Sequence, residues 1–212
     1  MANIKKGDLV KIEFTARTAI DGTVIETTDE EIAKKNNIWS KDNKYGPKLI
    51  IAQSGFMLIG LEEALAELEV GQEKEFKINY EKAFGPRKKE LVRVMSLKDF
   101  EKQKIKPTKG MLLNIENAFA TVKSVNSGRV VVDFNHPLAG QDLIYKLKLV
   151  ELITEPKEKC YALAKEFDAK ISTTSENGKI IVNVESIDKN KKNSFELALK
   201  ISLQDLVEVK YK

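Results

Sequence analysis

Residues 130–143 read VVVDFNHPLAGQDL and separate two parts of the chain that have different patterns. The three valines favour an extended strand, whereas Asn135-His136-Pro137 is typical of a turn. Before this stretch, residues 87–130 contain short apolar runs separated by turn residues, which predicts a small β-rich unit. After it, residues 143–152 predict one further strand. The stretch therefore lies between a predicted β-rich unit and a further predicted strand.

The residues before 87 predict strands that pack on one helix. Residues 9–15 alternate apolar and polar side chains, which is the period of a half-buried strand. The turn pair Asp21-Gly22 joins this strand to the run 23–27 as a hairpin. Residues 61–68 place four apolar side chains on one side of a short helix, and strand alternation returns in 75–80. This layout indicates an α+β fold.

A separate unit is predicted after Glu155-Pro156, because this pair ends the strand before it. The pattern beyond it predicts a helix over 157–167, strands over 170–174 and 179–187 joined by a turn at Asn177-Gly178, a helix over 194–201 and a last strand over 206–211. A unit this small buries only a modest fraction of its surface alone. We therefore expect it to dock or to self-associate, and its apolar run from Ile180 to Val184 supports that expectation.

The composition excludes several classes of protein. The 212 residues carry 36 basic and 32 acidic side chains, and the lysines lie among glutamates rather than in a basic arm, which argues against nucleic-acid binding. No run approaches the ~20 apolar residues of a transmembrane helix, and the polar start lacks the pattern of a secretory signal. We therefore expect a cytoplasmic protein. Its Lys/Glu-rich balance is typical of heat-adapted proteins.

Metal chemistry is not expected. The chain has one cysteine, Cys160, and one histidine, His136, so it cannot form an internal disulfide or a Cys/His zinc site. His136 lies in the predicted turn and is interpreted as a turn residue. Cys160 lies in a predicted helix, where a cysteine packs as a small apolar residue.

Taken in order, the motifs of residues 4–153 resemble the FK506-binding-protein (FKBP) type of peptidyl-prolyl cis-trans isomerase, in its long archaeal, SlyD-like form. They are GDLV at 7–10, DGTVIE at 21–26, MLIGLEEAL at 57–65, VGQ at 70–72, AFG at 83–85 and VVVDFNHPLAGQDL at 130–143. The last motif resembles members that carry an inserted chaperone domain, the insert-in-flap domain.

The resemblance implies an α+β fold with two domains, and the residues beyond it predict a third. Residues 1–87 and 131–154 would form the isomerase domain, an antiparallel half-barrel wrapped on a short helix. Residues 88–130 would form the small β-rich insert. Residues 155–212 lie outside the resemblance, and we expect a small α/β domain there that mediates dimerisation or adds a second chaperone surface.

The resemblance also implies an apolar cleft that grips the proline of an X-Pro bond and requires no cofactor. An X-Pro amide prefers trans by only ~0.5–1 kcal/mol, yet it interconverts slowly because rotation breaks amide resonance. A cleft that binds the twisted amide better than the planar one accelerates this rotation. Carried over by position, the residues around the cleft are Phe14, Ile25, Glu26, Met57, Leu58, Leu61, Phe84 and Tyr145, with Leu138 as a neighbour.

Three departures from the family pattern are expected to weaken turnover on short peptides. Phe84 stands where the family commonly has tyrosine, so a hydroxyl that would hydrogen-bond the substrate carbonyl is missing. Leu61 replaces an aromatic floor, as the SlyD-like branch also tolerates. Glu26 and Phe14 replace the usual aspartate and tyrosine, so the carboxylate reaches further and lacks its phenolic partner.

The predicted insert has more large apolar residues than so small a unit hides easily. Flexible methionine and aromatic side chains suit a promiscuous binding surface, and unpaired strand edges bind extended segments by adding a strand. The alternative is that these residues form an ordinary core. The residues expected to bind unfolded chain are Met95, Leu97, Phe100, Met111, Leu113 and Phe119.

The leading hypothesis is a peptidyl-prolyl cis-trans isomerase that is also a folding chaperone. The insert would capture unfolded or partly folded polypeptides and raise the local concentration of X-Pro bonds at the cleft. One alternative is a non-enzymatic holdase chaperone with a degenerate cleft, and another is a ribosome- or nucleic-acid-associated module. A homodimer through the C-terminal domain is a further expectation.

Overall fold

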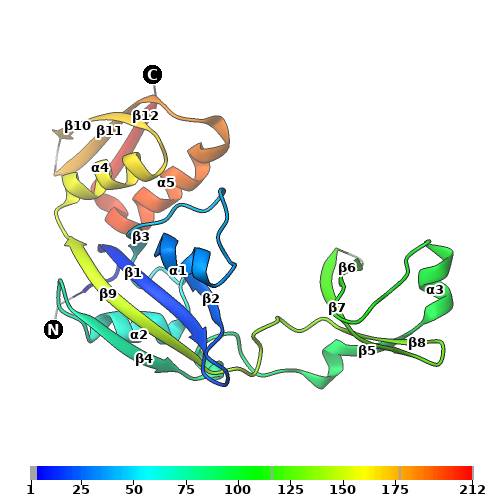
Figure 1. Ribbon diagram of the computed structural model, residues 1–212. Helices are drawn as coiled ribbons and strands as arrows, with labels where there is room; N and C mark the ends of the chain where they lie inside the picture. The colour runs from blue at the N-terminus through cyan, green and yellow to red at the C-terminus, as the bar shows by residue number, and fades with distance from the viewer. Residues whose placement is uncertain (1–3, 116, 177, 212) are drawn as a thin grey trace. The chain divides into compact units, whose positions relative to one another are not determined.

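The computed structural model describes residues 4–115, 117–176 and 178–211, and its chain divides into two compact units (Figure 1). The main unit consists of Met1–Asn79 and Asp142–Lys212, and the inserted unit consists of Tyr80–Gln141. The inserted unit extends at both ends beyond the segment 88–130 expected from the sequence. The C-terminal residues belong to the same compact unit as the N-terminal sheet.

An antiparallel sheet forms the centre of the main unit. Its strands are β1 (Leu9–Thr18), β2 (Val24–Thr27), β3 (Lys48–Ile51), β4 (Glu73–Ile78) and β9 (Leu143–Ile153). They run in the order β2-β1-β9-β4, and β3 also pairs with β1. Helix α1 (Glu30–Lys35) lies in the connection from β2 to β3, and α2 (Ile59–Ala66) precedes β4. This arrangement confirms the α+β class and the antiparallel sheet packed on a short helix.

The two faces of the sheet differ in polarity because the side chains alternate along each strand. One face carries ion pairs between strands: Lys146–Glu73 at 2.8 Å joins the neighbours β9 and β4, and Arg17–Glu75 at 2.7 Å reaches from β1 across β9 to β4. The other face is apolar and packs against α2. The helix approaches closely at Gly60, where a Cβ atom would collide with Cγ2 of Ile78. The glycine at this position therefore lets α2 rest directly on β4.

The inserted unit is a four-stranded antiparallel sheet with its own small core. Its elements are the 3₁₀ turns Tyr80–Lys82 and Lys89–Leu91, β5 (Val92–Ser96), α3 (Leu97–Lys102), β6 (Leu112–Ile115), β7 (Ala118–Asn126) and β8 (Arg129–Asp133). The strand order is β5-β8-β7-β6. The β-rich character was predicted, whereas α3 was not. The core consists of Phe100, Leu113, Ala120, Val122, Val130 and Val132.

Asp133 and Asn135 hold the two ends of the inserted unit together. Asp133 is buried and pairs with Arg87, and it also accepts a hydrogen bond from the Asn135 side chain at 2.8 Å. The Asn135 amide in turn bonds both backbone groups of Lys88, accepting from N–H at 2.8 Å and donating to C=O at 2.9 Å. These polar residues of the motif 130–143 therefore have a structural role, because they join the two ends of the inserted unit.

The C-terminal part of the main unit is a small α/β structure, as expected. It contains α4 (Pro156–Glu166), β10 (Lys170–Glu176), β11 (Lys179–Ser186), α5 (Lys189–Leu203), the 3₁₀ turn Gln204–Leu206 and β12 (Val207–Tyr211). Strand β11 is central, antiparallel to β10 and parallel to β12. Helix α5 begins before the predicted 194–201 because Asp188 caps it, accepting from the Asn190 N–H at 2.7 Å. The predicted turn at 177–178 falls at a residue outside the described ranges.

This α/β part docks on the end of the N-terminal sheet. Ile180, Val182 and Val184 of β11 belong to one core with Leu9 and Ile153 of the sheet. The apolar run that suggested self-association is therefore buried within the same chain. Cys160 is also fully buried here, and burial raises the pKa of its thiol to about 11. Its predicted role as a small apolar residue is confirmed.

A buried ion pair lies where the two parts meet. Lys159 of α4 donates to the Asp8 carboxylate at 2.9 Å and to the Gly7 carbonyl at 3.0 Å, and both charged side chains are almost fully buried. The Ser202 hydroxyl of α5 donates to the same carbonyl at 2.7 Å. Gly7 has φ of +85°, and a Cβ there would lie 2.9 Å from the Ser202 carbonyl oxygen. Only glycine accepts this backbone angle and this approach readily.

Among the described residues, no helix is long and apolar enough to cross a membrane.

We predict that Lys159→Met lowers the free energy of unfolding by about 3–5 kcal/mol, because Asp8 would stay buried without its partner. Denaturant unfolding would measure the change. The matched control is Lys191→Met, which breaks the exposed Lys191–Asp168 pair and is expected to change stability little. A loss for Lys159→Met no larger than that of the control would contradict the prediction.

Candidate functional site

Three of the residues expected around the cleft meet on the apolar face of the main sheet. Ala16 of β1 lies directly opposite Glu26 of β2 on one side and Tyr145 of β9 on the other. Opposed residues in an antiparallel sheet share a face, so Glu26 and Tyr145 flank the small Ala16 side chain. Phe14, two residues along β1, lies on the same face, and its ring centroid is 5.8 Å from that of Tyr145.

A neutral ion pair borders this aromatic surface. Lys48 of β3 binds Glu26 at 2.7 Å, and its ammonium lies 5.2 Å from the centre of the Phe14 ring. Both charged side chains are substantially exposed, and pairs of this kind contribute little to stability. The pair can therefore be broken at small cost. The sequence reasoning missed Lys48, whose place depends on the register of β3 against β1.

Tyr145 is the polar member of the aromatic surface. Its side chain is 4% exposed. Burial, and to a smaller degree the nearby Glu26 carboxylate, raise the pKa of its phenol to about 12. The hydroxyl therefore stays protonated and neutral at physiological pH, where it can donate a hydrogen bond.

The α2 residues of the expected site lie at the start of that helix. Met57 and Leu58 are half-buried just before its first turn, and Leu61 is buried in it. The close packing at Gly60 fixes this end of the helix against β4, which neighbours β9. These side chains add apolar surface and no charge.

Two expected site residues, Phe84 and Leu138, belong to the inserted unit. The Phe84 ring stacks on the His136 ring with centroids 4.0 Å apart and planes inclined by 7°. The Leu138 N–H donates to Nδ1 of His136 at 3.2 Å, and the Ala139 N–H donates to its carbonyl at 2.9 Å. These contacts confirm His136 as a turn residue.

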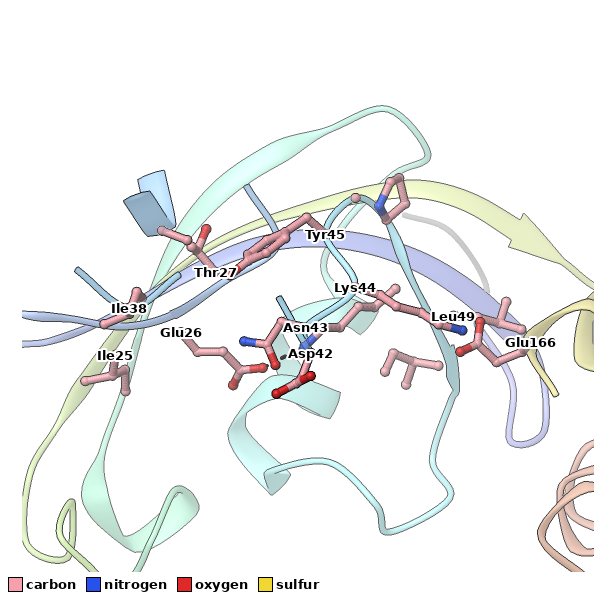
Figure 2. A pocket seen from close by; sticks show the side chains of 15 residues that line it. Ile25, Glu26, Thr27, Ile38, Asp42, Asn43, Lys44, Tyr45, Leu49 and Glu166 are labelled. Atoms are coloured by element: carbon pink, nitrogen blue, oxygen red, sulfur yellow. Dashed lines mark hydrogen bonds and ion pairs between the residues drawn. The ribbon is translucent and has the colours of Figure 1, made fainter. Parts of the chain in front are cut away.

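Two cavities open along β3. The first, of about 410 Å³, is lined by Ile25 and Glu26, by the loop 42–47, and by Glu166 of α4. Figure 2 shows Glu26, Asp42 and Asn43 converging in its middle, while Lys44 extends toward Glu166. The sequence reasoning missed the loop and Glu166, because neither carries a recognisable pattern.

The second cavity, also of about 410 Å³, is mainly apolar. Its walls come from the β3–α2 segment, including Phe56 and Met57, and from α4 and α5, including Phe167 and Leu197. It shares the lining residues Leu49, Ile50 and Glu166 with the first cavity, so the two have a common wall. Phe56 and Leu197 are largely exposed at its rim.

The residues expected to bind unfolded chain in the insert divide into two groups. Phe100 and Leu113 are buried in the core of the inserted unit, so they cannot contact a client, and the prediction for them was wrong. Met95 and Leu97 are partly buried against the same core. Phe119 and Met111 are exposed, at 77% and 36%. The alternative of an ordinary core was therefore right for part of the set.

Leu112 was missed, although it is 69% exposed. In the β6–β7 pair, Leu113 lies opposite Ala120 and Asn114 opposite Phe119. Leu112 and Phe119 therefore share the outer face, since alternate residues of a strand point to the same side. Strand β6 is also the edge of its sheet.

In the part of the chain that the structure describes, no three His, Cys, Asp or Glu side chains gather closely enough to hold a metal ion. The site consists of apolar and aromatic surface, one neutral ion pair and one phenol. Such a surface favours a reacting group whose polarity falls in the transition state.

Comparisons with known proteins agree with this chemistry. A family model described as "FKBP26, IF domain" matches residues 93–138. The chain is 37% identical over 146 residues to the short-type peptidyl-prolyl cis-trans isomerase of Methanocaldococcus jannaschii, covering 69% of this chain and 92% of the relative. It is 25% identical over 155 residues to the FKBP-type 16 kDa peptidyl-prolyl cis-trans isomerase of Escherichia coli K12, covering 71% and 94%. It is 26% identical over 155 residues to the FKBP-type isomerase SlyD of Helicobacter pylori, covering 71% and 74%.

Proposed function

The chain belongs to the FKBP-type peptidyl-prolyl cis-trans isomerase family, and we propose that it combines isomerisation of X-Pro bonds with the holding of unfolded chains. The substrates of such an isomerase are proline-containing polypeptides. The observation that carries the holding function is the exposed apolar pair of Leu112, on the edge strand β6 of the inserted unit, and Phe119, on the adjoining strand β7. We assign isomerisation to residues 1–87 and 131–154, and client holding to 88–130.

Isomerisation by this site requires no nucleophile. The barrier to rotation, ~18–20 kcal/mol, comes from resonance between the amide nitrogen and its carbonyl. In the twisted amide that resonance is lost and the carbonyl is less polar, so an apolar wall stabilises it relative to the planar form. Phe14, Tyr145 and Leu61 supply such a wall in the main unit. We assign Ile25, Glu26, Met57 and Leu58 to the same site, whereas Phe84 and Leu138, which belong to the inserted unit, stay predictions from the family resemblance.

Client holding is supported by the exposed edge of the insert. An extended segment of an unfolded chain would pair with β6 as an added strand, while Leu112, Phe119 and Met111 contact its apolar side chains. Binding at this edge keeps the client tethered and raises the effective concentration of its prolines at the isomerase site. We place this work in the cytoplasm, consistent with a single cysteine that is buried and free.

The C-terminal domain, 155–212, supplies a second client surface. Its helices form one wall of the apolar cavity that also contains Met57, which we assign to the prolyl site. A polypeptide whose proline occupies that site must continue on both sides of it, and the cavity offers its neighbouring segment an apolar path. Dimerisation through this domain stays a prediction, and the strand that motivated it is buried in the chain's own core.

Phe14→Ala is expected to reduce catalytic acceleration of a proline-limited refolding reaction by about tenfold, which corresponds to about 1.4 kcal/mol of lost transition-state stabilisation. The refolding rate at catalytic concentrations of the protein would measure it. Ile20→Ala, at an exposed hairpin position, should leave the acceleration unchanged. An equal rate for Phe14→Ala and the wild type would place catalysis elsewhere, and no acceleration by the wild type would favour a holdase without isomerase activity.

Replacing both Leu112 and Phe119 by serine is expected to abolish most suppression of client aggregation while leaving turnover of a short proline peptide unchanged. The substitution removes exposed apolar area and leaves the core of the inserted unit intact. Light scattering of a refolding client and a peptide assay would measure the two effects. Val94→Ser, also exposed but on the opposite edge strand β5, is the control. Undiminished suppression by the double variant would refute the assignment.

Leu197→Ser is expected to weaken binding of an unfolded, proline-containing chain several-fold, because Leu197 lines the apolar cavity. Leu206→Ser is a closely matched control, since the two leucines are 51% and 49% exposed in the same domain and Leu206 is not among the lining residues. Fluorescence anisotropy of a labelled, permanently unfolded client would report both affinities. Equal losses for the two variants would show that the cavity is not a client site.

A further inference from the structure

We propose that the Tyr145 hydroxyl donates a hydrogen bond to the carbonyl oxygen of the substrate proline, and so supplies the orienting donor that Phe84 lacks. This inference rests on the proposed prolyl site. Of the two aromatic residues that the main unit contributes to that site, Phe14 and Tyr145, only Tyr145 carries a hydroxyl.

The first observation is that this hydroxyl has no partner although its side chain is buried. Tyr145 is 4% exposed, and among the described residues no hydrogen bond involves its oxygen. The oxygen is not one of the fully buried, unpaired side-chain atoms in the described part of the chain, so it reaches solvent and is open to a ligand.

The second observation is where the hydroxyl lies. Tyr145 shares the apolar face of the sheet with Phe14 and Glu26, and its ring packs beside the Phe14 ring. The Glu26 carboxylate, which lies close enough to influence the phenol, is already bound to Lys48 at 2.7 Å. The phenol therefore remains free to bind a substrate carbonyl that enters over Phe14.

The third observation concerns the state of the phenol. Its pKa, raised to about 12 by burial and by Glu26, keeps the proton on the oxygen throughout the physiological range. A deprotonated phenolate could only accept hydrogen bonds, whereas the neutral group donates.

The geometry of the rotation indicates which carbonyl oxygen of the substrate accepts the hydrogen bond from Tyr145. The rotating X-Pro carbonyl loses polarity as the amide twists, so a donor bound to it would stabilise the planar state and slow the reaction. Groups on the X side of the bond change position relative to the ring during rotation. The carbonyl of proline itself stays attached to the ring through one bond and keeps its place. A donor to this oxygen therefore holds the substrate equally in the planar and the twisted states.

Removing uniform binding of this kind has a recognisable kinetic signature, a raised KM with an unchanged kcat. For Tyr145→Phe we expect KM for a short proline peptide to rise about three- to tenfold, the range of one net hydrogen bond, and kcat to stay within about twofold. The substitution keeps the ring and its packing on Phe14. Tyr161→Phe, which removes an exposed hydroxyl that bonds Thr173 at 3.2 Å, should change neither constant. A fall in kcat with an unchanged KM would overturn the proposal.

A substrate variant identifies the acceptor without relying on catalysis. Calorimetric titration would compare a peptide that ends in proline amide with one that ends in pyrrolidine, which lacks the proline carbonyl. The wild type should lose about three- to tenfold in affinity between the two ligands, and Tyr145→Phe should lose almost nothing. An equal loss in both proteins, or no loss in the wild type, would overturn the proposal. If the wild type shows the expected loss but accelerates no refolding, the proposed function fails while the hydrogen bond stands.

Discussion

The position of β9 between β1 and β4 is the constraint on which the rest of the structure depends. The strand pairs along its length with β1, from Leu143 opposite Thr18 to Ile153 opposite Leu9, and on its other edge with β4. It brings Tyr145 beside Phe14 and then leads into α4. Without this strand the sheet would be two separate pieces, and neither the aromatic surface nor the buried Lys159–Asp8 contact would form.

The same pairing explains how the chain accommodates an inserted unit. Ile78 at the end of β4 lies directly opposite Leu143 at the start of β9, so the unit that begins at Tyr80 replaces the loop of a hairpin. Loop-closure entropy rises only slowly with length, by about 0.6 kcal/mol per doubling. The inserted unit has its own core, and Asp133 and Asn135 join its two ends. The ends therefore stay close together, which lowers the entropic penalty of loop closure further.

The parts that were predictable from sequence are those with a local signal. Alternation in 9–15, the apolar stripe of 61–68 and the ordered motifs gave the sheet, the helix and the family. Register has no such signal, and a shift of one residue exchanges the two faces of a strand. For this reason Leu113 was taken as a client contact and its neighbour Leu112 was overlooked. Docking through Asp8 and Lys159, 151 positions apart, depends on tertiary structure and leaves no local pattern either.

The structure changes the interpretation of the aromatic residues that depart from the family pattern, because it shows which residues lie beside them. In the sequence, Phe14 and Phe84 each count as a lost hydroxyl. In the fold, Phe14 and Tyr145 lie on adjacent strands with ring centroids 5.8 Å apart, so the Tyr145 hydroxyl belongs to the same aromatic surface as Phe14. Moving the phenol from β1 to β9 also places it deeper, where burial keeps it neutral and where it remains unpaired. A site that has lost one hydrogen-bond donor can still orient its substrate if it holds another donor among apolar side chains. Its apolar wall then remains suited to the less polar, twisted amide.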